Sequence, residues 1–276
     1  MTRTACRNRR MLQVTGACVA ALLALSACSS SGSNAGSDAS APAGASGKPS
    51  GTVNVFAAAS LTESFTELGE EFEERHPGTK VVFNFGGSDS LAAGITSGAP
   101  ADVFASASPK TMKIVTDAGD AKGTPATFVR NRLEIATLPG NPHRIGSLKD
   151  LTAGDLKVVL CDRTVPCGAA AAKALTAAGL ELTPVSYEED VKSALNKVVL
   201  KEADAAVVYR TDVKAAGDKV EGVEFPEAAE AAEAINDYPI ALLEDAPHAE
   251  GGKAFIELVR SAEGRKVLTE AGFTAP

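Results

Sequence analysis

The feature that most limits how this chain can fold is a regular alternation of short β-type runs with helical segments, beginning at Gly51. Residues 52–58 favour a strand, and apolar side chains then recur at helical spacing until His76-Pro77, where we expect the helix to end. The alternation continues with predicted strands at 80–85 and 101–105 and helices at 91–95 and from Ser108-Pro109 onward. Strands joined by short helical connections predict a parallel sheet with helices on both faces.

A second series of the same kind starts near Arg132. Its predicted elements cover residues 133–137, 157–160, 169–178, 185–187, 190–200 and 205–209, and the tail adds a strand at 238–243 and helices at 249–260 and 262–271. We therefore predict an α/β fold of two lobes, each a mainly parallel sheet flanked by helices, with a ligand cleft between them. Lobe 1 comprises residues 51–130 and 239–276, and lobe 2 comprises residues 131–238.

The first 27 residues have the features of an export signal, with four arginines followed by a short apolar run. Leu-Ser-Ala-Cys at 25–28 resembles a bacterial lipobox, which implies cleavage before Cys28 and a lipid on its sulfur. An ordinary secretory signal is the alternative, and Arg9-Arg10 leaves twin-arginine export open. Residues 28–50 lack large apolar side chains, so we expect a disordered tether. The mature protein is then exported and lipid-anchored at the outer face of the cytoplasmic membrane.

Charge and composition argue against several functions. Acidic residues outnumber basic ones, 35 to 27, aromatic residues make up 5% and Trp is absent, so no nucleic-acid partner is expected. The histidines at 76, 143 and 248 lie far apart and lack metal-ligand spacing, so we interpret them as surface residues. Nucleotide-binding and nucleophile-elbow motifs are also missing. The sequence therefore favours binding over catalysis, with no cofactor.

Two strand-to-helix turns in lobe 1, residues 57–62 and 86–91, are rich in small residues and carry Ser60 and Ser88. One interpretation is that each serine caps the helix that follows it. The other is that the turns line a ligand crevice, where helix N-termini offer N–H groups to an anion. Lobe 2 has similar turns at 161–168, 188–191 and 207–212. Because the lobe 1 turns contain no Lys or Arg, an anion there would be held by neutral donors.

Five segments stand in order along the body: Val-Phe-Ala-Ala-Ala-Ser-Leu-Thr at 55–62, Gly-Ala-Pro-Ala-Asp-Val-Phe at 98–104, Glu-Asp-Val with Ala-Leu within 189–195, Val-Val-Tyr at 207–209 and Ala-Gly-Phe-Thr at 271–274. Together they resemble the periplasmic molybdate-binding proteins, the solute receptors of molybdate ABC transporters. The resemblance implies a periplasmic-binding-protein-like fold and an oxyanion held by hydroxyls and backbone amides. By position, the hydroxyls belong to Ser60, Ser88 and Tyr209, and the lobe 2 amides to Cys167 and Val191.

The resemblance also implies partners. The ligand is molybdate or tungstate, with the metal bound only as part of the oxyanion, and an ABC permease receives it at the membrane. We expect a monomer that is attached to the membrane by the lipid on Cys28. Cys167 stands where the family often has Ala, but only its backbone amide is needed.

The chemistry of the ligand agrees with a site made of donors. Molybdate at neutral pH only accepts hydrogen bonds, whereas hydrogen phosphate carries a proton that needs an acceptor. Sulfate must be excluded by size, and tungstate is too similar in size to be excluded. Asp89 stands where the family commonly has Ser or Thr, and it would favour phosphate if it faced the cleft. We expect it to point away instead, as an acidic residue in the first turn of a helix.

Cys161 and Cys167 are the cysteines that remain after an export signal and a lipidated Cys28 are set aside. In an exported protein they favour a disulfide, which would brace the turn that carries the Cys167 amide. A pair of free thiols is the alternative. Three alternatives to a molybdate receptor also remain: a receptor for sulfate or phosphate, a secreted hydrolase with Ser60 or Ser88 as nucleophile, and a structural lipoprotein.

Overall fold

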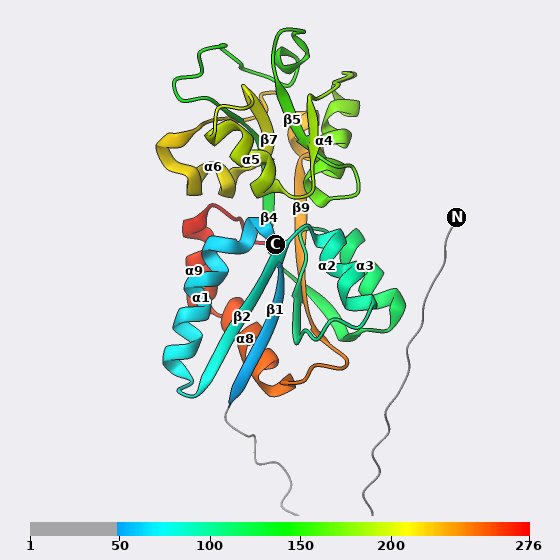
Figure 1. Cartoon of the computed structure of the whole chain (residues 1–276), viewed down its shortest axis with the longest axis vertical. Coiled ribbons are helices and arrows are strands. Elements are labelled where there is room, and N and C mark those ends of the chain that lie inside the picture. The colour runs from blue at the N-terminus through cyan, green and yellow to red at the C-terminus, as the bar shows by residue number, and fades with distance from the viewer. Residues whose placement is uncertain (1–48) are drawn as a thin grey trace, which may run out of the picture. The chain divides into compact units, whose positions relative to one another are not determined.

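The computed structural model describes residues 49–276 (Figure 1). The predicted signal peptide (1–27), the lipidation site Cys28 and almost all of the predicted tether (28–50) lie outside the described residues. Within the described part, no helix is both long and apolar enough to cross a bilayer. The strands are β1 (Gly51–Ala58), β2 (Thr79–Gly86), β3 (Val103–Ala105), β4 (Ala121–Thr137), β5 (Val158–Cys161), β6 (Ser186–Glu188), β7 (Ala205–Tyr209), β8 (Glu221–Val223) and β9 (Ile235–Leu243).

The helices cover the two groups of strands. They are α1 (Thr62–Arg75), α2 (Ser88–Thr96), α3 (Pro109–Ala118), α4 (Pro166–Ala177), α5 (Val191–Val199), α6 (Arg210–Ala216), α7 (Ala228–Glu233), α8 (Ala249–Arg260) and α9 (Ala262–Ala271), with short 3-10 turns at Ala59–Leu61, Asp150–Thr152 and Gly217–Lys219.

The strands follow the order β2-β1-β3-β9-β4-β7-β5-β6, with β8 beside β4. β1 pairs in parallel with β2 and β3, and β5 pairs in parallel with β6 and β7. Antiparallel pairs formed by β4 and β9 complete each sheet. The α/β fold of two lobes is thus as predicted, and the parallel strands that end at the turns of interest occur in both lobes.

The long strands β4 and β9 run from one lobe to the other, and we call them the connecting strands (Figure 1). β4 pairs with β9 as far as Arg132 and with β7 from Leu133 onward. Our division of the body after residues 130 and 238 stays a prediction, and it falls within the paired part of the connecting strands.

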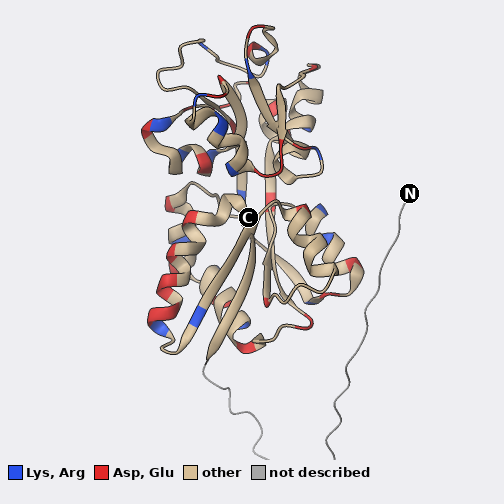
Figure 2. Cartoon of the chain, in the orientation of Figure 1, with Lys and Arg blue, Asp and Glu red and all other residues tan. Residues whose placement is uncertain are grey.

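The core of lobe 1 explains the helical spacing in its sequence. Phe65 and Phe72 on α1 both pack edge-on against Phe255 of α8, and all three rings are fully buried. The C-terminal helices α8 and α9 contact α1, as expected. Acidic residues are frequent on the exposed side of α1 (Figure 2). The acidic side chains of α1 therefore lie on the outside of the lobe, and the turn between β1 and α1, residues 57–62, carries no charge at its start.

Candidate functional site

All five residues predicted to hold the ligand line one cavity between the turns of the two lobes. The lining consists of Ala58, Ala59, Ser60, Gly86, Gly87, Ser88 and Ala107 from lobe 1, and Val165, Pro166, Cys167, Asp190, Val191 and Tyr209 from lobe 2. Its volume is about 10 Å³, room for one water. Parallel strands place these turns together because their carboxyl ends meet at the same edge of each sheet. No Lys or Arg is part of the lining.

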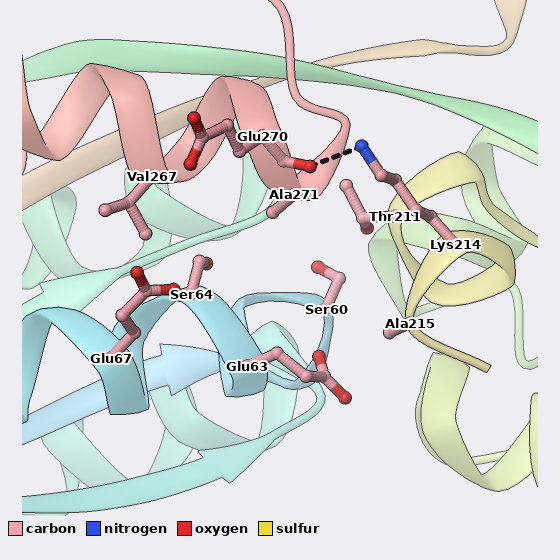
Figure 3. A pocket seen from close by; sticks show the side chains of 10 residues that line it. All are labelled: Ser60, Glu63, Ser64, Glu67, Thr211, Lys214, Ala215, Val267, Glu270 and Ala271. Atoms are coloured by element: carbon pink, nitrogen blue, oxygen red, sulfur yellow. Dashed lines mark hydrogen bonds between the residues drawn. The ribbon is translucent and has the colours of Figure 1, made fainter. Parts of the chain in front are cut away.

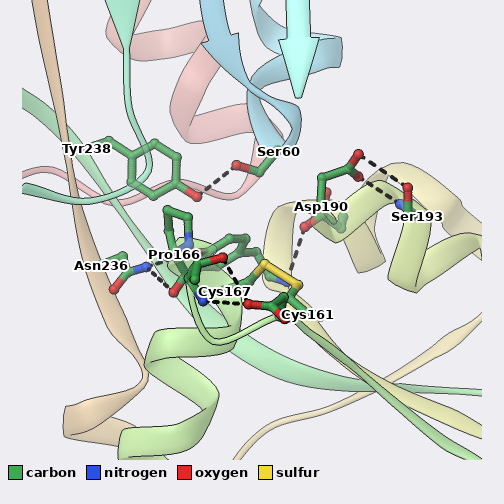
Figure 4. The surroundings of a disulfide bond; sticks show 12 residues. Ser60, Cys161, Pro166, Cys167, Asp190, Ser193, Asn236 and Tyr238 are labelled. Atoms are coloured by element: carbon green, nitrogen blue, oxygen red, sulfur yellow. Dashed lines mark hydrogen bonds between the residues drawn. A yellow bond between two sulfur atoms is a disulfide. The ribbon is translucent and has the colours of Figure 1, made fainter. Parts of the chain in front are cut away.

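The two serines do not cap the helices that follow them, so the capping interpretation is wrong. The N-cap of α2 is Gly87, and Ser88 accepts a hydrogen bond at Oγ from the Ala107 backbone N–H at 3.0 Å. Ser60 lies inside the 3-10 turn before α1, and its Oγ is 2.8 Å from the Tyr238 hydroxyl (Figure 4). Both serines are almost fully buried, with their hydroxyls at the cavity rather than on their own helices.

Lobe 2 contributes the N-termini of α4 and α5. The first turns of these helices leave the N–H groups of Cys167 and Val191 without an acceptor anywhere in residues 49–276. Asp190, the N-cap of α5, has its carboxylate turned to its own helix, where it accepts from Ser193 N at 2.8 Å (Figure 4). The cavity is therefore lined by hydrogen-bond donors and by the positive ends of two helix dipoles.

Two tyrosines from different elements pack together beside the cavity: Tyr209 at the end of β7 lines it, and Tyr238 in β9 does not. Their rings pack edge-on at 5.9 Å, and burial raises the pKa of both hydroxyls above the ordinary value. Both stay neutral at physiological pH and can donate a proton. Asn236 Nδ2 donates to the Tyr209 oxygen at 2.6 Å, and it also donates to the carbonyl of Pro166 at 3.2 Å.

A disulfide between Cys161 and Cys167 joins the end of β5 to the first turn of α4 (Figure 4). Both cysteines are buried. The next residue, Gly168, packs so tightly on this loop that a Cβ there would lie 2.0 Å from the carbonyl oxygen of Asp162. The disulfide and the glycine contact together fix where the Cys167 N–H points.

Asp89 is not part of the cavity lining. It lies in the first turn of α2, as expected, but it does not point away from lobe 2: its Oδ2 accepts a hydrogen bond from Thr164 Oγ1 of that lobe at 3.1 Å. The feature that would have favoured a phosphate receptor is thus absent from the cavity.

A network of ion pairs links the two lobes beside the cavity. Lys192, the second residue of α5, donates to Glu63 of lobe 1 at 2.7 Å and lies 3.1 Å from Asp212 Oδ1 of lobe 2. Asp212 is fully buried and accepts from the Tyr209 backbone N–H. Burial raises the pKa of its carboxyl to about 6 in spite of the adjacent lysine.

A larger hollow of about 250 Å³ lies behind Ser60, between α1, α6 and α9 (Figure 3). Its charged lining is mostly carboxylate: Glu63, Glu67 and Glu270 face it, with Lys214 as the cation. The Lys214 ammonium donates to the backbone carbonyl of Glu270. Repulsion by three carboxylates disfavours a dianion there, so the smaller neutral cavity is the candidate site.

The cavity is suited to binding rather than to hydrolysis. Within residues 49–276 the hydroxyl of Ser60 is bonded to a tyrosine and that of Ser88 to a backbone N–H, so neither has a histidine or lysine as a general base. The same residues contain no group of side chains arranged to hold a metal ion.

Sequence reasoning missed Tyr238, Asn131 and Asn236. All three lie within the connecting strands rather than in strand-to-helix turns, where ligand residues were sought. Nothing in the local pattern separates them from other strand residues. Only the antiparallel pairing of β4 with β9, which places Asn131 opposite Asn236, reveals them.

The fold and the cavity define a two-lobed receptor for a small anionic solute. The chain belongs to the bacterial extracellular solute-binding protein family, whose profile matches residues 53–274. It is 43% identical over 225 residues to the molybdate-binding protein ModA of Mycobacterium tuberculosis, covering 82% of this chain and 85% of the relative. It is 30% identical to the putative ABC transporter substrate-binding lipoprotein YvgL of Bacillus subtilis, covering 81% and 86%.

The fold is also that of a solved structure. The periplasmic molybdate-binding protein of Azotobacter vinelandii superposes with a TM-score of 0.71 over 81% of this chain and 99% of that chain, at 21% identity. Residues beyond 274 and before 53 take no part in the family match.

Proposed function

We propose that this protein is an extracytoplasmic receptor that captures molybdate or tungstate between its lobes and delivers the oxyanion to an ABC permease. The observation that carries the proposal is that one cavity collects hydroxyl and N–H donors from both lobes without a lining cation. The relatives named molybdate-binding proteins support the choice of anion. The protein binds its ligand and performs no chemistry on it.

The proposed donors are the hydroxyls of Ser60, Ser88 and Tyr209 and the amides of Cys167 and Val191. Hydrogen bonds to a charged acceptor contribute about 1.5 to 3 kcal/mol each, so a few of them offset the desolvation of a dianion. Because the present cavity holds only one water, the lobes must move apart to admit the larger oxyanion. Exclusion of hydrogen phosphate follows from the lack of an acceptor for its proton.

Calorimetric titration of the purified, unlipidated protein with molybdate, tungstate, sulfate and phosphate tests the proposal. We expect one-to-one binding of the first two anions only. Two of the three tyrosines lie at the site and Trp is absent, so tyrosine fluorescence gives an independent readout. Tyr209→Phe and Ser60→Ala each should weaken binding about tenfold or more, because each removes a donor to a charged acceptor.

Ser64→Ala is the matched control, because the Ser64 hydroxyl bonds to the Leu61 carbonyl and faces the acidic hollow instead of the cavity. It should bind molybdate as the wild type does. Preferential binding of phosphate, or silence with all four anions, would exclude the proposed function.

Attachment to the membrane is the second part of the proposal. A lipid on Cys28, in the Leu-Ser-Ala-Cys segment, would anchor the receptor close to its permease. The relative named as a lipoprotein supports this assignment. Cys28→Ser should move the protein from the membrane fraction to the medium, as followed by immunoblotting of both. Retention of the variant in the membrane fraction would contradict lipid anchoring.

A further inference from the structure

Two asparagines face each other where the connecting strands pair. Asn131 of β4 and Asn236 of β9 are register partners, and each side-chain amide approaches a tyrosine hydroxyl at the cavity. Asn131 is almost fully buried, with 2% of its surface exposed. Polar side chains at such positions must find partners, and the identity of those partners fixes which end of each amide faces the cavity.

The orientation of Asn236 follows from a backbone carbonyl. The Pro166 oxygen can only accept, so the amide atom that lies 3.2 Å from it is the nitrogen. The same Nδ2 lies 2.6 Å from the Tyr209 oxygen and donates to it. Since the Asn236 amide nitrogen can only donate, Tyr209 accepts in this contact and its own proton is available to the cavity that the residue lines.

The orientation of Asn131 follows from a backbone N–H. Its Oδ1 accepts from Arg132 N at 3.0 Å, so Nδ2 is the end that faces Thr211 Oγ1 at 2.9 Å and the Tyr238 oxygen at 3.4 Å. The 2.8 Å contact between the Tyr238 and Ser60 hydroxyls can be made with either one as donor, and the Asn131 bond to the Tyr238 oxygen favours the arrangement in which Tyr238 donates. Ser60 then accepts from Tyr238 and keeps its proton for the cavity.

The third hydroxyl at the cavity, that of Ser88, also accepts a hydrogen bond from a protein group. Ser88 Oγ accepts from the Ala107 backbone N–H, which cannot reverse its polarity. In the arrangement with Tyr238 as donor, all three hydroxyls receive a hydrogen bond from the protein and keep a proton available to the cavity. Without such partners a hydroxyl can rotate and accept instead, because it carries both a proton and lone pairs.

We propose that Asn131 and Asn236 are positioning residues that hold Ser60 and Tyr209 as donors, and that they thereby restrict the site to fully deprotonated oxyanions. The inference rests on the proposed function and adds to it the residues that determine the protonation state of the ligand. Neither asparagine is part of the cavity lining, so each acts through the tyrosine that it contacts.

Two anions that differ in whether they carry a proton can test whether the asparagines determine the protonation state of the ligand. Selenate and hydrogen arsenate are tetrahedral dianions of similar size at mildly alkaline pH, but only hydrogen arsenate carries a proton that needs an acceptor. Both are titrated as competitors against molybdate, on the wild type and on Asn236→Ala. Removal of the Asn236 donor frees Tyr209 to accept, so the affinity for arsenate relative to selenate should rise by at least about tenfold.

Two further variants separate this effect from a structural one. In Tyr209→Phe, which lacks the hydroxyl, adding Asn236→Ala should leave the arsenate-to-selenate ratio unchanged. Asn196→Ala removes an exposed asparagine of α5 and should leave the ratio of the wild type intact. Asn131→Ala should raise the ratio in the same direction as Asn236→Ala, through Tyr238 and Ser60.

An unchanged ratio in Asn236→Ala, with molybdate still bound, overturns the inference and leaves the proposed function standing. A rise that persists in the Tyr209→Phe background also overturns it, because the effect would then not pass through the tyrosine. If the wild type binds neither molybdate nor selenate, both the proposed function and the inference fail.

Discussion

Residues at the cavity are positioned by side chains whose contacts sequence patterns do not reveal. Asp212 is the clearest case, since it is fully buried in lobe 2 and supports the backbone of Tyr209. Its neighbours with charge are Lys192 and, across the lobe boundary, Glu63. Burial outweighs the lysine and raises the pKa of the carboxyl from 3.8 to about 6. Part of the stability of the fold should therefore vary with pH.

We expect Asp212 to stabilise the folded protein less as the pH rises through about 6. Between about pH 4 and pH 6 the folded state holds a proton on Asp212 that the unfolded chain has released. The stabilisation that this protonation gives the folded state is therefore complete below the pKa of the unfolded state and is lost above the pKa of the folded state. Relative to Asp212→Asn, the wild type should lose about 1 to 3 kcal/mol of unfolding free energy between these limits.

Urea unfolding of the two proteins across this pH range measures the difference. Asp218→Asn, which changes an exposed carboxylate in the turn after α6, is the control and should follow the wild type. Parallel pH profiles for wild type and Asp212→Asn would show that folding does not raise the pKa of the Asp212 carboxyl, and would contradict the prediction.

At the scale of elements, the sequence predicted best where periodicity was strong. Helices α8 and α9 have the predicted bounds, because their apolar residues recur regularly and Ser261 caps α9. The first half of β4 was missed, since Gly123 and Pro125 with polar neighbours suggest a loop. The short α6, α7 and β8 were missed as well, because elements of three to seven residues carry too little periodicity.

The site residues that follow a strand could be predicted from the sequence, whereas those placed by the pairing of two distant strands could not. Ser60, Ser88 and the lobe 2 amides follow strands, and the carboxyl ends of parallel strands are expected to line a crevice. The start of α4 was placed three residues late, although Pro166, which occupies the first turn of the helix, is a local signal that could have found it. Asn131 and Asn236 depend on the β4–β9 register, which no local signal sets.

The start of α4 also yields a prediction at the element scale. The Cys161–Cys167 bond closes a loop with a sequence separation of 6, for which the entropic model gives about 2 kcal/mol of stabilisation. Cys161→Ser combined with Cys167→Ser should lower the unfolding free energy by about this amount. It should also weaken molybdate binding, since the loop that carries the residue 167 N–H becomes freer.

Thermal unfolding and molybdate titration of the double variant check both parts. The wild type treated with a thiol reductant should move toward the variant, whereas the variant should not respond to the reductant. Equal molybdate affinity with and without the disulfide would mean that Gly168 and the Asn236 contact to Pro166 suffice to orient α4.

For the whole molecule, function depends on how closely the lobes approach. Gly87, the N-cap of α2 in lobe 1, lies against the backbone of Glu189 in lobe 2, and a Cβ on Gly87 would be 2.6 Å from the Glu189 oxygen. The backbone of Gly87 has φ −61° and ψ 130°, which alanine adopts without strain. Within lobe 1 the added Cβ would lie 2.8 Å from Asp89 Oδ1, the end of a side chain that can move, whereas the Glu189 backbone of lobe 2 cannot, so the added bulk chiefly opposes closure.

Gly87→Ala should accordingly weaken molybdate binding by about tenfold or more while changing the unfolding free energy of the ligand-free protein by less than about 1 kcal/mol. Gly94→Ala is the matched control in the same helix, because the nearest atoms to its new Cβ are 3.9 Å away. Titration calorimetry gives the affinities, and small-angle X-ray scattering with and without molybdate follows closure. We expect Gly94→Ala to compact on binding as the wild type does and Gly87→Ala to remain more open. Equal affinity and equal compaction of the two variants would mean that the lobes of the bound form stay farther apart at Gly87 than in this structure.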